Sequence, residues 1–212
     1  MNPREKTPFI VQAITYLANL IILNLLFLLC SLPLVTYGAS LSALFTMVRA
    51  INEGETVVAK GFFRAFREQF RQSSAGWLAM LLPGAFLYVE AALLLQVNVE
   101  VPAMLYVCVA APALVYCALV PWVLIQASYF TCTLKQSLKN AVLLAVQLLP
   151  QTVVLAVIQV LPVGLFLLRT LDFLRLWPLW LFLYFAGAYA LAERLVKLPM
   201  DRLVASLRET EE

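Results

Sequence analysis

Four amide side chains inside apolar segments are the residues best suited to handle a polar solute. Gln147 and Gln151 are four positions apart, Gln159 lies about a third of a helical turn from them, and Asn19 lies in the first apolar run. Polar groups inside a membrane are costly, so each is a functional candidate. They could line a polar seam, or they could hydrogen-bond neighbouring helices together, and the spacing allows both.

Charged side chains beside the apolar segments offer two further candidates. Glu90 is the only acid that the pattern places well inside an apolar context. It could act as a coupling carboxylate, or it could sit at a partly wet helix end. Arg169, Asp172 and Arg175 are spaced by three, which predicts an ion-pair cluster, with a site for an anionic solute as the alternative.

Several kinds of catalytic chemistry are missing from the sequence. Histidine does not occur, which excludes serine triads with histidine, haem ligation by histidine and HExxH metal sites. The four cysteines are scattered without a CxxC pair and are predicted to be buried thiols: Cys30, Cys108, Cys117 and Cys132. No phosphate-binding loop and no GxGxxG motif is present. We therefore expect no enzymatic activity, no cofactor and no metal site.

An amphipathic segment over residues 59–73 is the most informative local feature. Aromatic residues recur on one helical face and charged residues on the other. The residues proposed to contact lipid or a partner are Phe62, Phe63, Arg64, Phe66, Arg67, Phe70 and Arg71. One interpretation is a helix on the inner membrane surface, with its arginines near anionic lipid, and the other is a docking surface for a partner protein. The net charge of only +3 argues against nucleic-acid binding.

The elements that must position these residues are membrane helices. Of the 212 residues, 63% are apolar and 13% charged, about half the charge of a soluble chain. Long charge-free runs without alternation exclude a barrel. The predicted fold class is all-α, a polytopic transmembrane helical bundle forming one integral membrane domain over residues 1–212. The predicted segments cover about residues 9–32, 38–51, 74–97, 103–127, 141–168 and 176–193, followed by a cytoplasmic tail at 194–212.

The first apolar run must hold two helices. No charged residue occurs between Lys6 and Arg49, a run about twice as long as one crossing needs. Pro33 favours a break, and Thr36 is expected to cap a short second helix over about residues 38–51. With six segments, 13 of the 15 Lys and Arg residues and both termini lie on the cytoplasmic side. With five, the N-terminus lies outside and the split is 11 to 4, while the C-terminus stays cytoplasmic.

The first third of the chain carries residues that resemble a known family. They are residues 24–40 (NLLFLLCSLPLVTYGAS), 43–44 (AL), 61–66 (GFFRAF) and 70–73 (FRQS). This pattern resembles the YesL-like family of bacterial membrane proteins, a domain of unknown function. The resemblance implies a location in the bacterial plasma membrane and an association with carbohydrate uptake and degradation. It supplies no catalytic residues.

These observations lead to two functional hypotheses. The first is an accessory or regulatory component of carbohydrate uptake or utilisation, with the lipid bilayer and sugar transport or sensing membrane proteins as partners. The alternative is a small-solute transporter with a polar seam through the bundle. The sequence does not indicate an oligomeric state or a transported substrate.

Overall fold

Helices form almost all of the chain that the structure describes. The computed structural model describes residues 8–54, 57–96 and 102–209, and no strand occurs in these ranges. The α-helices are α1 (Phe9–Ser31), α2 (Tyr37–Glu53), α3 (Val58–Gln96), α4 (Ala103–Ile125), α5 (Leu134–Gln147), α6 (Leu149–Leu168), α7 (Thr170–Arg175), α8 (Trp177–Leu179) and α9 (Phe185–Glu209). Between them lie the 3₁₀ turns η2 (Leu34–Thr36) and η3 (Gln126–Ser128) and the π-helical turn η4 (Trp180–Tyr184).

Six helical stretches are long and apolar enough to cross a membrane. They are Phe9–Ser31, Leu34–Glu53, Val58–Leu94, Ala103–Ser128, Leu149–Phe166 and Trp177–Arg202. The prediction of an all-α, multi-pass membrane protein is therefore confirmed. The second stretch was expected to be short, but its 20 residues match the length that one crossing requires, which favours six spans over five.

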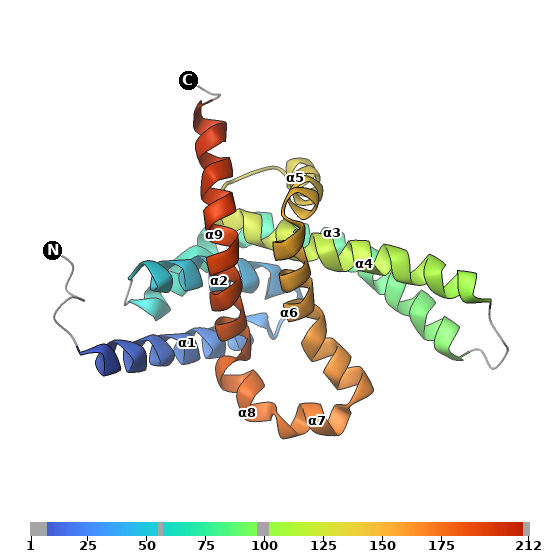
Figure 1. Ribbon diagram of the computed structural model, residues 1–212, viewed down its shortest axis with the longest axis horizontal. Coiled ribbons are helices and arrows are strands. Elements are labelled where there is room, and N and C mark those ends of the chain that lie inside the picture. Colours follow the sequence, from blue (N-terminus) through green and yellow to red (C-terminus); the bar gives the residue numbers. More distant parts are fainter. Residues whose placement is uncertain (1–7, 55–56, 97–101, 210–212) are drawn as a thin grey trace.

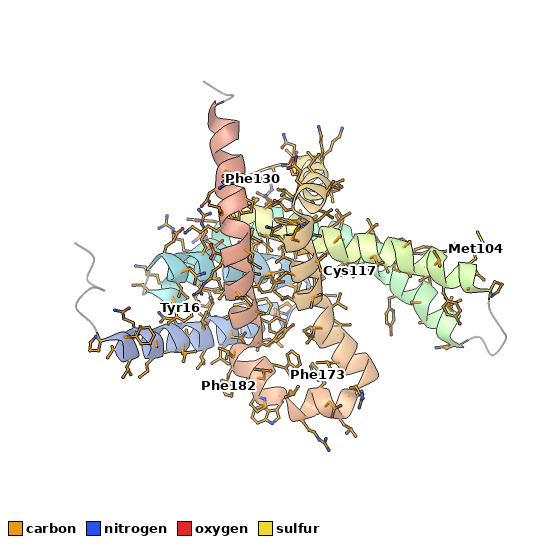
Figure 2. All side chains as sticks on the ribbon, viewed as in Figure 1. Tyr16, Met104, Cys117, Phe130, Phe173 and Phe182 are labelled. Carbon is orange, nitrogen blue, oxygen red and sulfur yellow. The ribbon has the colours of Figure 1, made fainter. Side chains whose placement is uncertain are left out.

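The helices spread from a shared centre (Figure 1). The N-terminal end of α1 extends to one side, the α3–α4 pair extends to the other, and α6 and α9 run across them. At the centre, α2 packs against α1, α3, α4 and α9. The far ends of α3 and α4 expose apolar side chains, including Met104 near their tip (Figure 2). Hydrocarbon can cover this surface without cost, because lipid tails are themselves apolar.

Small side chains let α2 approach α3 and α4 closely. At Gly38, a Cβ atom would lie 2.5 Å from the backbone oxygen of Ser73 on α3, so only glycine fits without displacement. One turn further, the hydroxyls of Ser42 and Ser73 are 2.6 Å apart. Ser42 itself donates to the carbonyl of Leu124 on α4 at 2.5 Å, so Ser73 is the donor in the pair. These contacts explain why α2 is the most buried of the six stretches.

The turn between α1 and α2 differs from the expectation that Thr36 caps the second helix. The Thr36 hydroxyl donates to the carbonyls of Cys30 (2.6 Å) and Pro33 (2.8 Å), and it makes no capping bond to α2. The last carbonyls of a helix have no partner within it, and Thr36 satisfies one of those of α1 instead. At its other end α2 stops at Gly54, whose φ of 116° favours glycine.

The segment predicted as one span over residues 141–168 is two helices. α5 begins at a capping box, in which the Thr133 side chain accepts from the Gln136 N–H and the Gln136 side chain accepts from the Thr133 N–H. It ends before Leu148, whose φ of −116° and ψ of 48° lie outside the helical region. Pro150 lies in the first turn of α6 and has no N–H to donate to a hydrogen bond. The first N–H groups of a helix have no partner within it, so proline is tolerated there and the break falls just before it.

The last span begins irregularly and is longer than the predicted residues 176–193. Its helical structure runs from α8 through η4 into α9, which continues to Glu209 through the predicted tail. Asn24 of α1, which is fully buried, stabilises the irregular start. Its Nδ2 donates to the carbonyls of Trp180 (2.9 Å) and Leu181 (2.8 Å), and its Oδ1 accepts from the Ala186 N–H (2.9 Å). A π-turn displaces the regular helical bonds, and Asn24 replaces them.

Two helix-interior prolines are compensated by side chains from a neighbouring helix. Pro162 cannot donate to the Ile158 carbonyl, which accepts from the Tyr184 hydroxyl at 2.9 Å instead. Pro199 likewise frees the carbonyl of Leu195, and the Nε2 of Gln151 approaches it at 3.5 Å. Both bonds join α6 to the last span, so the proline breaks also hold these helices together.

Candidate functional site

The inner face of the amphipathic segment packs on α2. Phe62 is completely buried in the core, and a Cβ atom at Gly61 would lie 2.7 Å from the sulfur of Met47. Gln69 donates through Nε2 to the Thr46 hydroxyl at 2.8 Å. The prediction that Phe62 contacts lipid or a partner is therefore wrong. The aromatic face meets the apolar side of α2, and this contact removes Phe62 from solvent.

The outer face of the segment stays exposed. Phe63 and Phe70 are 50% and 38% exposed, and Phe66 is half-buried between them and the core. Arg64 forms an exposed ion pair with Glu68 at 2.9 Å. Exposed arginines follow at positions 67 and 71. We call Phe63, Arg64, Arg67, Phe70 and Arg71 the outer arginine face.

The segment is not a separate helix but the first part of α3. At about 1.5 Å per residue, the 39 residues of α3 span about 58 Å, nearly twice the thickness of the hydrocarbon core, about 30 Å. The polar part therefore has the length to extend beyond the apolar layer. Because no break separates the two parts, a force on the outer arginine face acts directly on the span.

A pocket of about 660 Å³ opens beside the outer arginine face. Its lining residues are Glu68, Arg71, Gln72, Ala75, Thr131, Cys132, Thr133, Leu134 and Gln136. Gln72 orders the segment opposite, because its Nε2 donates to the Phe130 carbonyl (3.3 Å) and its Oε1 accepts from the Cys132 N–H (3.2 Å). Burial raises the pKa of the Cys132 thiol, so this side chain is an uncharged wall of the pocket at neutral pH.

A second polar cluster joins α2 to α9 and α1. Glu53 on α2 accepts from Lys197 (2.8 Å) and lies 3.4 Å from Arg49, whose other contact is Asp201 at 3.4 Å. The Arg49 guanidinium also lies 4.6 Å above the centre of the Tyr129 ring, a cation–π arrangement. Burial raises the pKa of Tyr129, and although Arg49 opposes this shift, the hydroxyl stays protonated at neutral pH.

The centre of this cluster is a buried carboxylate, Glu193, which the sequence pattern did not indicate as a candidate. Glu193 is fully buried, and its Oε2 accepts from the Nδ2 of Asn52 at 2.6 Å. Asn52 in turn accepts a hydrogen bond from the hydroxyl of Tyr16 on α1, at 2.9 Å. Tyr16 is labelled in Figure 2. Glu90, predicted to be the only acid inside an apolar context, is half-buried. The signal that could have identified Glu193 is its spacing of three, four or seven from the buried residues Ala186, Tyr189, Ala190, Val196 and Met200.

The four residues of the predicted polar seam are not brought into one line. Gln147 is exposed at the end of α5, on a different helix from Gln151 and Gln159. Asn19 is buried on α1, while Gln151 is committed to the carbonyl freed by Pro199. Gln159 on α6 is half-buried, and its Oε1 has no hydrogen-bond partner among the described residues. The break at Leu148 is the reason, because it separates two glutamines that one helix would have stacked.

The remaining candidates are placed as follows. The carboxylate of Asp172 lies 3.5 Å from Arg169 and 3.6 Å from Arg175, which confirms the predicted ion-pair cluster. All three side chains are substantially exposed. The four cysteines are free thiols, but Cys108 on α4 is exposed and the other three are only half-buried, so the prediction that all four are buried is wrong. Within the described ranges, no group of three or more Cys, Asp or Glu side chains is placed to hold a metal ion.

Comparison with known proteins gives one match. No curated protein and no solved structure is similar to the chain. Residues 20–91 match a family described as "Protein of unknown function, DUF624". The match runs from α1 to α3, so it includes Asn24, Asn52 and the outer arginine face, whereas Glu193 lies outside it.

Proposed function

We propose that this chain is an accessory or regulatory component of the bacterial plasma membrane that works with carbohydrate uptake or utilisation. The proposal includes membership of the YesL-like family, cytoplasmic N- and C-termini, and a sugar transport or sensing protein as the partner. The match of residues 20–91 to a family of unknown function is compatible with it. The resemblance of residues 24–40 and 61–73 supports the bacterial and carbohydrate context.

The observation that carries the proposal is the outer arginine face on an unbroken helix. Its inner side is fixed, since Phe62 is buried and Gln69 bonds to Thr46 on α2. Its outer side displays cations, of which Arg64 has a side chain that is 80% exposed. A rigid, exposed arginine surface flanked by aromatic side chains is typical of contacts with an acidic protein surface.

Mechanistically, partner binding would act on the bundle through α3. A displacement of the outer arginine face moves the span directly, because α3 is continuous from Val58 to Gln96. It also moves α2, which contacts α3 along the Gly38–Ser73 approach. The chain would thus report partner engagement to the membrane without carrying out chemistry itself.

The test is recovery of partners from native membranes. A photo-crosslinking amino acid at position 67, followed by gentle solubilisation and mass spectrometry, is expected to recover a component of a sugar transport or sensing system. The variant R64Q/R71Q in the same background is expected to reduce recovery roughly tenfold, the equivalent of about 1.4 kcal/mol. The matched control R169Q/R175Q removes two exposed arginines elsewhere and should leave recovery unchanged. Recovery of lipid adducts alone would refute the partner and leave the membrane-surface interpretation.

Transport through the predicted polar seam is not favoured as a second function. Gln147 is exposed and lies on α5, and Gln151 is bonded to the last span. Purified chain in liposomes is therefore expected to move none of a panel of sugars and ions. Uptake abolished by Gln159→Leu would revive the transporter hypothesis.

A further inference from the structure

Glu193 is a buried carboxylate, and one of its two oxygens has no hydrogen-bond partner among the described residues. Its exposed fraction is zero, and it lies in the last span, where α9 packs on α2. The Oε2 atom accepts the short bond from Asn52, whereas Oε1 is buried and has no hydrogen-bond partner among the described residues. An unpaired buried charged oxygen costs several kcal/mol in apolar surroundings, so an arrangement of this kind calls for a counter-charge.

The neighbouring cations already form ion pairs with other carboxylates. Lys197 pairs with Glu53 at 2.8 Å, and Arg49 lies between Glu53 and Asp201 at 3.4 Å from each. Among the described side chains of this cluster, two cations therefore face three carboxylates, and the carboxylate without an ion pair is the one that is fully buried. This set has one positive charge fewer than it has negative charges.

A second buried oxygen lies in the same neighbourhood. The Tyr129 hydroxyl is also buried without a hydrogen-bond partner in the described chain, and Glu193 acts on it electrostatically. Phe45 contacts both Tyr129 and Tyr189, at ring-centre distances of 6.2 and 6.4 Å, and Tyr189 lies one turn before Glu193. A neutral hydroxyl and a carboxylate oxygen are the ligand types that an alkali cation prefers.

We propose that Glu193 binds one monovalent alkali cation where α9 packs on α2. The cation sits on Oε1, with the Tyr129 hydroxyl as the neutral oxygen of the same neighbourhood. Occupancy neutralises the buried carboxylate and stabilises the packing of α9 on α2. This site is separate from the outer arginine face and does not depend on the proposed partner.

The groups that set the local field come from every element packed around the site. They are Tyr16 on α1, Arg49, Asn52 and Glu53 on α2, Tyr129 after η3, and Lys197 and Asp201 on α9. Lys197, Glu53 and Asp201 have side chains that are 37%, 45% and 43% exposed, so solvent screens them, while Glu193 is shielded. The bound charge is thus held mainly by Glu193.

The test compares the thermal unfolding of purified full-length wild type and Glu193→Gln in detergent. An alkali cation bound only by the folded chain raises Tm by roughly 3–5 °C for each tenfold increase in NaCl above Kd, at constant ionic strength set with choline chloride. This sodium dependence should be lost in Glu193→Gln and kept in the matched control Glu90→Gln. Equal responses of wild type and Glu193→Gln to sodium would overturn the proposal.

A measurement on the wild type keeps the proposal testable if Glu193→Gln does not fold. An apolar carbodiimide reacts with buried carboxyl groups, and peptide mass spectrometry locates the adduct. Sodium is expected to suppress the labelling of Glu193 at least fivefold. Labelling that sodium does not reduce, or no labelling at all, in a chain whose Tm does not depend on sodium would also overturn the proposal.

Discussion

Replacing Asn24 with leucine removes three hydrogen bonds at the irregular start of the last span while keeping the branched skeleton of four side-chain heavy atoms. The lost bonds join Asn24 to the carbonyls of Trp180 and Leu181 and to the N–H of Ala186, at 2.9, 2.8 and 2.9 Å. All three backbone groups belong to the π-turn or the residues beside it, where regular helical bonding cannot replace them. Asn24→Leu should therefore loosen the contact between α1 and the last span.

The expected loss can be worked out from the bonds. Hydrogen bonds between membrane helices contribute about 0.6 kcal/mol each on average and about 1.7 kcal/mol at most. Three bonds give roughly 2–5 kcal/mol, with the upper end favoured because Asn24 has no access to solvent and its partners would remain unpaired. The free energy of unfolding should fall by that amount.

The assay is reversible unfolding in mixed micelles of increasing SDS, followed by circular dichroism, with amide hydrogen exchange at Ala186 as a local probe. Asn19→Leu is the matched control, because Asn19 is on the same helix, is also buried, and its side chain makes no hydrogen bond among the described residues. Exchange at Ala186 should accelerate in Asn24→Leu alone. If the two variants are equally stable and exchange at Ala186 is unchanged, the reasoning that Asn24 sustains the π-turn is refuted.

Two further pairs of substitutions, each a change at a contact with α2 and its control, test the packing around that helix. Gly38→Ala should destabilise the chain by about 1–3 kcal/mol, because the new Cβ atom would lie 2.5 Å from the Ser73 oxygen, whereas Gly164→Ala, which meets nothing within 4 Å, should be neutral or slightly stabilising. Phe62→Ala should cost about 3–5 kcal/mol and Phe63→Ala under about 1 kcal/mol, since only the first is buried. SDS unfolding measures both pairs, and equal effects within a pair would contradict the corresponding packing.

Much of the fold could be predicted because charge marks the ends of apolar helices. The first helix, predicted over residues 9–32, is observed at Phe9–Ser31, and the fourth segment, predicted over 103–127, is Ala103–Ile125 followed by η3. The break at Leu148 was missed because residues 140–168 contain no charge, and only the backbone at Leu148 and the position of Pro150 mark it. A charge-free run therefore predicts how many residues are in apolar helix, but it does not predict how many separate helices they form.

The candidate site was predicted less well, because its contacts join residues far apart in sequence. The outer arginine face could be predicted from local periodicity. The burial of Phe62 could not be predicted in this way, because it depends on packing against α2. Glu193 was assigned to the end of a span because it is followed by Arg194, a pattern that usually marks an aqueous boundary. Its partner Asn52 is 141 residues earlier in the chain, and no local pattern links the two.

The same separation has a consequence for how the protein is made. Ribosomes add about 5–20 residues per second, so Asn52 is synthesised about 7–28 s before Glu193 completes the contact. During that interval the polar end of α2, with Asn52 and Glu53, has none of its α9 partners. These side chains must stay hydrated or in contact with the insertion machinery until translation reaches α9. α9, which is synthesised well after α2, therefore closes the structure that α2 begins.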